Sequence, residues 1–154
     1  HLANEARGPD ILFTFPWSSA TNSYGLAGTD LVHSMRAMGV RSGDASSHGS
    51  MSPWTIRNTC LAWGVDFKCG VEVRVPASNV DLVPTILALK GIPADASLNG
   101  RVLHEALIGG PDEEQIAVDT RVLTTETRSG RYQAAIQISA VAHQRYIDKS
   151  WRVR

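Results

Sequence analysis

The sequence predicts a mixed α/β protein, because two kinds of hydrophobic pattern follow each other along it. Segments typical of strands alternate with segments typical of helices up to residue 108, and strand-like segments alone follow from residue 115. The first order is typical of part of an α/β sheet, and the second is typical of an antiparallel β meander. We therefore expect an α/β region over residues 1–110 and a β-hairpin or meander over residues 111–154 that packs on it.

Composition limits the classes of function. The 154 residues are 43% hydrophobic and 19% charged, as in an ordinary globular domain, and 15 basic side chains balance 15 acidic ones. A neutral chain has no strong field to attract a nucleic-acid polymer or an anionic membrane. The longest apolar run, residues 82–89, is too short to span a bilayer. The compartment stays open, with the cytoplasm slightly favoured because no signal peptide is recognisable.

The start of the chain predicts that more sequence precedes it. There is no initial Met, and a strand-like segment follows almost at once. We expect either the C-terminal portion of a longer protein or a chain trimmed at a natural boundary.

Three short strands and one long loop are predicted in the α/β region. Asp10–Phe15 is strand-like and is stopped by a proline, and Thr59–Trp63 reads as a buried strand that ends at a glycine. Val71–Val75 alternates with period two, so one face is expected to be apolar and the other wet. Trp17–Asp30 is dense in Ser, Thr, Asn and Gly and is predicted to be a loop. One helical turn is expected over residues 55–58.

Residues 81–92 form the best-specified helix of the sequence. Asp81 suits the N-cap position, which puts Pro84 in the first turn, where its missing N–H costs nothing. Gly91 is typical of the position after a helix end. As an N-cap, Asp81 is expected to contribute about 1 kcal/mol, the usual loss when such a residue is replaced by Ala.

The rest of the chain predicts one short helix and three strands. Arg101–Leu107 is the helix, between glycine-containing segments. Ile116–Thr127 and Arg131–Val141 are rich in β-branched residues, with Ser129-Gly130 as the hairpin turn between them. Tyr146–Val153 is the third strand.

His48 is the candidate metal ligand. It lies in the loop Ser46–Pro53, where small neighbours leave the imidazole uncovered and Gly49 widens the choice of backbone conformations. The alternative is a solvated loop histidine. Ser50 and Ser52 are interpreted as loop residues, because no base is positioned by sequence and no Gly-x-Ser-x-Gly motif occurs.

The other candidate residues have simpler interpretations. Cys60 and Cys69 match no zinc-binding or redox spacing, so we expect two reduced, buried thiols, with a disulfide left open. His33 and His104 are interpreted as surface or packing residues. No catalytic residue is assigned.

Five segments together resemble the C-terminal part of the alkaline-phosphatase superfamily. They are Ser47–Ser50, residues 58–67 (NTCLAWGVDF), Gly70-Val71, residues 80–92 (VDLVPTILALKGI) and Asn99–Leu103. The order of a His-Gly loop, a strand ending in Gly-x-x-Phe, an Asp-Leu-x-Pro-Thr helix and a Gly-Arg-x-Leu segment is closest to the type I phosphodiesterase/nucleotide pyrophosphatase group. The match covers residues 9–108, and the helix motif is shared with sulfatase-like relatives.

The resemblance implies a three-layer α/β/α fold and a hydrolase of phosphoric esters with two metal ions, usually zinc. His48 matches the last metal ligand in chain order, and neutral imidazole is a normal zinc ligand. Two such ions would stabilise both the attacking and the leaving oxygen. The nucleophile motif and the Asp-His-Gly motif have no counterpart here, so the chain alone is expected to be inactive.

The partners implied are a missing N-terminal part of the same protein and a small phosphate ester. Sulfate esters or phosphonates are alternative substrates. The alternative to an enzyme is a non-catalytic module, which packs and binds a partner through its C-terminal β-hairpin region. Apolar surface left uncovered on such a piece would favour association, including a homo-oligomer.

Overall fold

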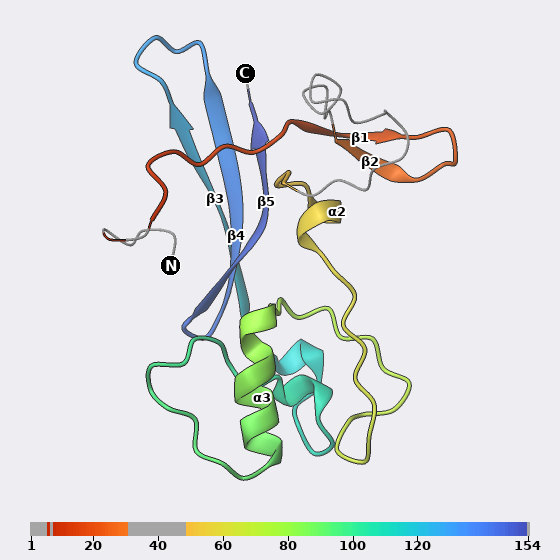
Figure 1. Cartoon of the computed structure of the whole chain (residues 1–154). Coiled ribbons are helices and arrows are strands. Elements are labelled where there is room, and N and C mark those ends of the chain that lie inside the picture. Colours follow the sequence, from red (N-terminus) through yellow and green to blue (C-terminus); the bar gives the residue numbers. More distant parts are fainter. Residues whose placement is uncertain (1–5, 7, 31–48, 154) are drawn as a thin grey trace. The chain divides into compact units, whose positions relative to one another are not determined.

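The computed structural model describes residues 6, 8–30 and 49–153 (Figure 1). Contacts divide the chain into two compact units. The first takes residues 1–58, 126–134 and 149–154, and the second takes residues 59–125 and 135–148. The elements are β1 (Trp17–Thr21), β2 (Ala27–Asp30), α2 (Pro53–Ile56), α3 (Leu82–Leu89), β3 (Val118–Glu126), β4 (Gln133–Val141) and β5 (Gln144–Arg152), with 3-10 turns at Asn79–Asp81, His104–Ala106 and Glu113–Gln115.

The predicted meander is confirmed as a three-stranded sheet in the order β3-β4-β5 (Figure 1). The N–H of Thr127 donates to the carbonyl of Tyr132 at 3.0 Å and closes the hairpin between β3 and β4. Polar side chains then tie all three strands together, because Asp148 accepts hydrogen bonds from Ser139 at 2.7 Å and from Gln137 at 3.0 Å. Between β4 and β3, the hydroxyls of Ser139 and Thr120 lie 3.2 Å apart. Such cross-strand pairs fix the register of a sheet.

The hydrophobic core of the second unit lies where the sheet meets the preceding segment. Val75, Val141 and Tyr146 are buried together, and Val73 and Ile116 pack against them. The apolar side of residues 71–75 is therefore buried only toward its end, because Val75 is buried and Val73 partly buried, whereas Val71 is 54% exposed. In addition, these residues form no strand in the structure.

The helix α3 is confirmed, with Pro84 buried in its first turn and Lys90 at the C-cap position. Gly91 follows with φ +64°, and Ile92 donates to the carbonyl of Leu87 at 2.9 Å, as at many helix ends. The role of Asp81 was predicted wrongly. It already has helical φ and ψ in the preceding 3-10 turn, and its side chain makes no cap hydrogen bond to α3.

The prediction of a loop over Trp17–Asp30 was wrong, because β1 and β2 pair there as an antiparallel hairpin with an irregular register. The side chain of Asn22 makes the turn by accepting the N–H groups of Tyr24 at 2.9 Å and Leu26 at 3.0 Å. The Trp17 ring anchors the hairpin, since its N–H donates to the carbonyl of Ser150 at 2.6 Å. Its strands are rich in small and polar residues, which hides them from a hydrophobic-pattern analysis.

Other predicted elements of the α/β region do not form among the described residues. Asp10–Phe15 contributes only Phe15, in a parallel bridge with Ser50, and Thr59–Trp63 forms no strand. The predicted helix 101–107 is reduced to the 3-10 turn at His104–Ala106. The mixed α/β class is therefore confirmed, whereas no extended parallel sheet is present in the described part of the chain.

Both cysteines were predicted to be buried, and both are exposed and free. Within the described residues, no helix is long and apolar enough to cross a membrane.

Gly100 offers a direct test of this fold. Its φ is +100°, and a Cβ atom built there would overlap the backbone carbonyl of Val80. We expect Gly100→Ala to lower the free energy of unfolding by about 2 kcal/mol or more, from the overlap and the left-handed backbone together. Gly109→Ala is the matched control, because Gly109 has φ +78° but open space around it, so about 1 kcal/mol is expected. Equal losses in urea unfolding would contradict the close approach to Val80.

Candidate functional site

The structure describes the His-Gly loop from Gly49 onward, and the proposed ligand His48, like His33, lies outside the described residues. The carbonyl of Gly49 accepts the N–H of Phe15 at 3.1 Å, next to the parallel bridge between Phe15 and Ser50. Gly49 has φ +115°, a conformation that side-chain-bearing residues rarely adopt. The position directly after His48 is therefore held by backbone hydrogen bonding and depends on glycine.

Ser50 and Ser52 have structural roles, in agreement with their interpretation as loop residues. Ser52 is fully buried, and its hydroxyl accepts the N–H of Thr55 at 3.0 Å as the N-cap of α2. The hydroxyls of both serines also donate to the hydroxyl of Thr55, each at 2.9 Å. These contacts hold the exit of the loop and leave neither serine aimed at an approaching substrate.

The second group of interacting polar residues lies in the second unit, around the buried carboxylate of Asp81. Its side chain is completely buried. One oxygen accepts the N–H of Ser78 at 2.7 Å, and the other accepts the N–H of Arg101 at 2.8 Å. Asp81 thus joins its own turn to a segment 20 residues further along the chain.

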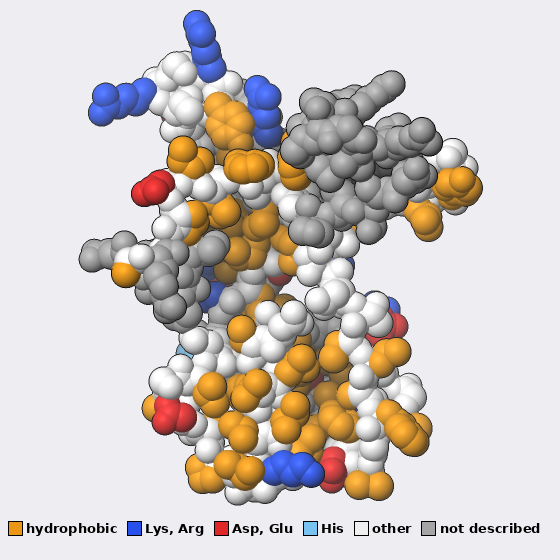
Figure 2. Space-filling model, in the orientation of Figure 1, with side chains coloured by type: hydrophobic (Ala, Val, Ile, Leu, Met, Phe, Trp, Pro, Cys, Tyr) orange, Lys and Arg blue, Asp and Glu red, His pale blue; other side chains and the backbone are white. Residues whose placement is uncertain are grey.

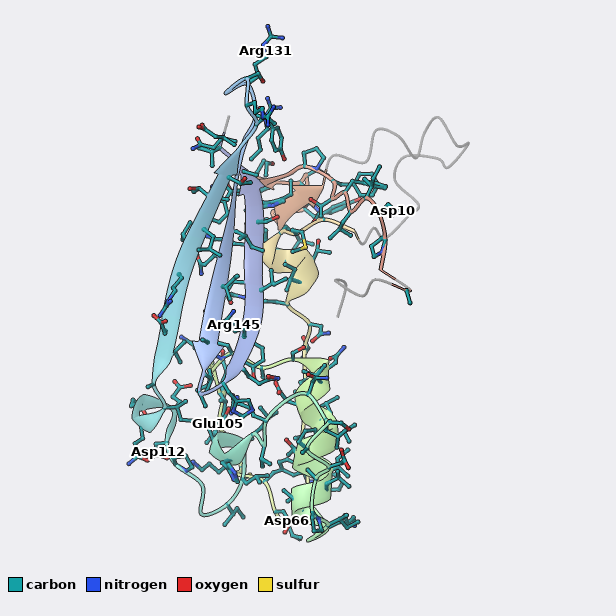
Figure 3. The ribbon with its side chains drawn as sticks, turned by 90° about the vertical axis from the view of Figure 1, so that its left-hand side faces the viewer. Asp10, Asp66, Glu105, Asp112, Arg131 and Arg145 are labelled. Carbon is teal, nitrogen blue, oxygen red and sulfur yellow. The ribbon has the colours of Figure 1, made fainter. Side chains whose placement is uncertain are left out.

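The guanidinium of Arg101 lies at the centre of the same group. It binds Glu105 through two hydrogen bonds of 2.5 and 2.9 Å, with the side chains only 10% and 2% exposed. It also donates to the Tyr146 hydroxyl and to the carbonyl of Pro76, each at 3.0 Å. Figure 3 places Glu105 on the short turn that lies beside α3. Fork-shaped pairing of this kind is the strongest geometry for an Arg–carboxylate pair.

The charges of these side chains follow from their surroundings. Burial by itself raises the pKa of Glu105, but the hydrogen bonds and charge of Arg101 outweigh it and hold that pKa below its ordinary value. Burial raises the pKa of the Tyr146 phenol to about 12, although the charge of Arg101 opposes this. Near neutral pH the pair is therefore ionised, and Tyr146 keeps its proton as a hydrogen-bond donor.

Thr85 completes the connection between the two segments. Its hydroxyl donates to the carbonyl of Asp81 at 2.7 Å and accepts the N–H of Leu103 at 3.0 Å. The Asp and Thr of the Asp-Leu-x-Pro-Thr motif therefore each bind the Gly-Arg-x-Leu motif. We name the set Asp81, Thr85, Arg101, Glu105 and Tyr146 the buried polar cluster. Sequence reasoning missed this cluster, although the two neighbouring motifs were its visible signal.

The described residues do not form a metal site by themselves. Nowhere in residues 8–30 and 49–153 do three or more His, Cys, Asp or Glu side chains lie close enough to hold an ion. The buried polar cluster has its donors and acceptors used internally, which makes it a scaffold. A pair of divalent ions would therefore need ligands from outside the described residues.

Comparison with known proteins identifies no relative: no family model, no curated protein and no solved structure matches this chain.

The Arg101–Glu105 pair predicts how stability changes with pH. Because the pKa of Glu105 is lower in the folded state, its contribution is present above the ordinary pKa of 4.5 and is lost as the pH falls through the folded value. We expect Glu105→Gln to lower the free energy of unfolding by about 3 kcal/mol at pH 7, since it leaves Arg101 buried without a charge partner. The difference from the wild type should shrink below pH 4.5.

Glu72→Gln is the control for this experiment. Glu72 pairs with Arg74 at 3.2 Å, but both side chains are more than three-quarters exposed. An exposed pair contributes less than about 1 kcal/mol. Urea titrations at several pH values measure the free energy of unfolding of both variants. Equal losses of this free energy at pH 7 would show that the buried pair stabilises the protein no more than the exposed pair does.

Proposed function

We propose that this chain is the C-terminal part of a metal-dependent hydrolase of phosphoric esters, similar to the type I phosphodiesterase/nucleotide pyrophosphatase group of the alkaline-phosphatase superfamily. In this proposal the complete protein has the three-layer α/β/α fold, and His48 is one ligand of a pair of divalent ions, zinc in the simplest case. The remaining ligands and the Thr or Ser nucleophile come from an upstream part. The chain supplies a ligand and a scaffold, and its substrate class is a small phosphate ester.

The observation that carries the proposal is the contact between two motifs of the resemblance. Asp81 and Thr85 come from the first motif, and each side chain binds a backbone N–H of the second, at Arg101 and Leu103. Gly100 is the first residue of the second motif, and a Cβ atom at this position would overlap the backbone carbonyl of Val80. The motif residues thus have a shared physical reason to occur together at this spacing, which supports a real resemblance over a chance match.

The geometry of the loop supports the role of His48. A metal ligand needs a backbone whose position does not vary, because coordination bonds tolerate errors of only a few tenths of an ångström. The hydrogen bond from Phe15 to Gly49 fixes the residue next to His48, and the buried Ser52 fixes the exit of the loop. The serines stay structural in this proposal.

The experiment is a histidine substitution in the complete protein. We expect His48→Ala to remove bound zinc and to lower turnover of a chromogenic phosphodiester by about tenfold or more, because ligand and second-shell losses at metal sites have effects of at least this size. Zinc is measured by mass spectrometry of the purified protein, and turnover is measured at saturating substrate.

His143→Ala is the matched control, since His143 is exposed in the turn between β4 and β5. It should leave metal content and turnover unchanged. Unchanged zinc and turnover in His48→Ala would remove the assigned role of His48 and favour the non-catalytic module. A sulfate ester and a phosphonate, tested in parallel, separate the alternative substrates.

A further inference from the structure

The strand β3 leaves one edge of the three-stranded sheet open. The strand order is β3-β4-β5, so β4 is the only neighbour of β3 in the described part of the chain (Figure 1). All nine residues of β3 are exposed. Proteins commonly protect such an edge with proline, lysine or a bulge, because its unpaired N–H and C=O groups can pair with another strand. Residues 118–126 contain neither proline nor lysine.

The pairing with β4 decides which backbone groups of β3 face outward. The N–H of Thr127 donates to the carbonyl of Tyr132, and the hydroxyls of Thr120 and Ser139 lie 3.2 Å apart. Both contacts belong to the same register, so no bulge interrupts the pairing between them. Because the direction of the backbone groups alternates along a strand, the odd-numbered residues of β3 direct theirs to β4. The even-numbered residues from 118 to 126 direct theirs away from it.

The segment around Thr120 is complementary to itself. Residues 118–122 read Val-Asp-Thr-Arg-Val. If two copies run antiparallel about a two-fold axis at Thr120, Val118 of each copy lies opposite Val122 of the other. Asp119 of each copy then lies opposite Arg121 of the other. The outward backbone groups pair in this register, and the charged residues take the positions without hydrogen bonds, where facing side chains are closest.

The charges on β3 favour a second strand of the same sequence. Asp119 and Arg121 already form an ion pair of 2.7 Å within β3, with side chains 56% and 76% exposed. Such an exposed pair contributes little by itself. Charges of one sign would repel a second copy, whereas this pair presents both signs. Two copies bring four charges of alternating sign together, and opposite charges directly across a strand pair stabilise it.

The charges also select one register among those that the backbone allows. An axis at Asp119 or at Arg121 would place like charges opposite each other, which destabilises a strand pair. An axis at Val122 would place Arg121 opposite Leu123, and no charge would meet its counterpart across the axis. Only the axis at Thr120 places each of the two charges opposite one of the other sign.

The other exposed apolar surface of the second unit is less specific. Figure 2 shows hydrophobic side chains gathered over α3, where Val83 and Ile86 are about half exposed. Apolar contact is not directional, so these side chains do not specify one partner. The strand β3 specifies its partner twice, by the direction of its backbone groups and by the order of its charges.

We propose that β3 is the interface of a homodimer, in which two copies of this chain pair antiparallel about a two-fold axis at Thr120. The same surface is used on both copies, as in most dimers, and the two sheets join into one. A single strand pair buries a small area, so the dimer forms reversibly and depends on concentration. This inference does not rest on the proposed function.

Charge reversal tests the register directly. Sedimentation velocity of the 154-residue chain over a series of concentrations gives the dissociation constant of the dimer. We expect Asp119→Arg and, separately, Arg121→Asp to raise this constant by about tenfold or more, because each places like charges opposite each other twice in every dimer. The double variant, with both substitutions in one chain, should dimerise about as well as the wild type, because opposite charges face each other again.

Glu72→Arg is the matched control. Like Asp119, Glu72 is an exposed acid that pairs with an arginine two residues further along the chain, Arg74. Its reversal changes the net charge by the same amount as Asp119→Arg but leaves β3 intact. The dissociation constant should therefore stay at the wild-type value.

Four outcomes would overturn the proposal. A wild-type chain that is monomeric at about 1 mM, where even a millimolar complex is largely formed, would exclude the dimer. A dimer that neither single variant weakens would place the interface elsewhere. A double variant as weak as the single ones would contradict the register. A complete protein that stays monomeric, while the chain alone dimerises, would assign the edge of β3 to the upstream part.

Discussion

The second unit depends on the burial of one carboxylate. Asp81 is completely shielded from water, so its charge must be balanced by hydrogen bonds in place. The N–H groups of Ser78 and Arg101 supply them, and the Arg101 side chain then turns to Glu105. Removing any one partner leaves a buried charge or donor unsatisfied, which costs far more than the interaction contributes. Because losing one partner costs more than the interaction contributes, the buried polar cluster favours one arrangement of the chain.

The cluster also shows what two of the sequence motifs do. The Asp and Thr of the Asp-Leu-x-Pro-Thr helix serve as acceptors for backbone N–H groups of the Gly-Arg-x-Leu motif. In the proposed function, the metal ligand comes from the His-Gly loop in the other unit. There Gly49 is held by the distant Phe15, and Ser52 is held by the nearby Thr55. Scaffold and ligand are thus assigned to different segments of one chain.

The sequence predicted the elements whose stability is local. α3 has its periodicity, its proline and its terminal glycine within a dozen residues, and the strands β3 to β5 follow one another through short turns. The role of Asp81 was not predictable, because its partner Arg101 is chosen by tertiary contact. The β1–β2 hairpin escaped prediction because its strands are polar and its turn depends on the Asn22 side chain. The prediction of a strand over Thr59–Trp63 was wrong for another reason. A strand that is apolar on both faces needs neighbouring elements to cover it, and the described residues do not supply them.

Hydrogen exchange of two backbone amides tests the central role of Asp81 most directly. The N–H groups of Ser78 and Arg101 donate to a fully buried carboxylate, so they should open only when the second unit unfolds. The account predicts that both amides exchange as slowly as those of β4 around the buried Ser139. Exchange of either amide at the rate of an exposed loop, with β4 still protected, would contradict it.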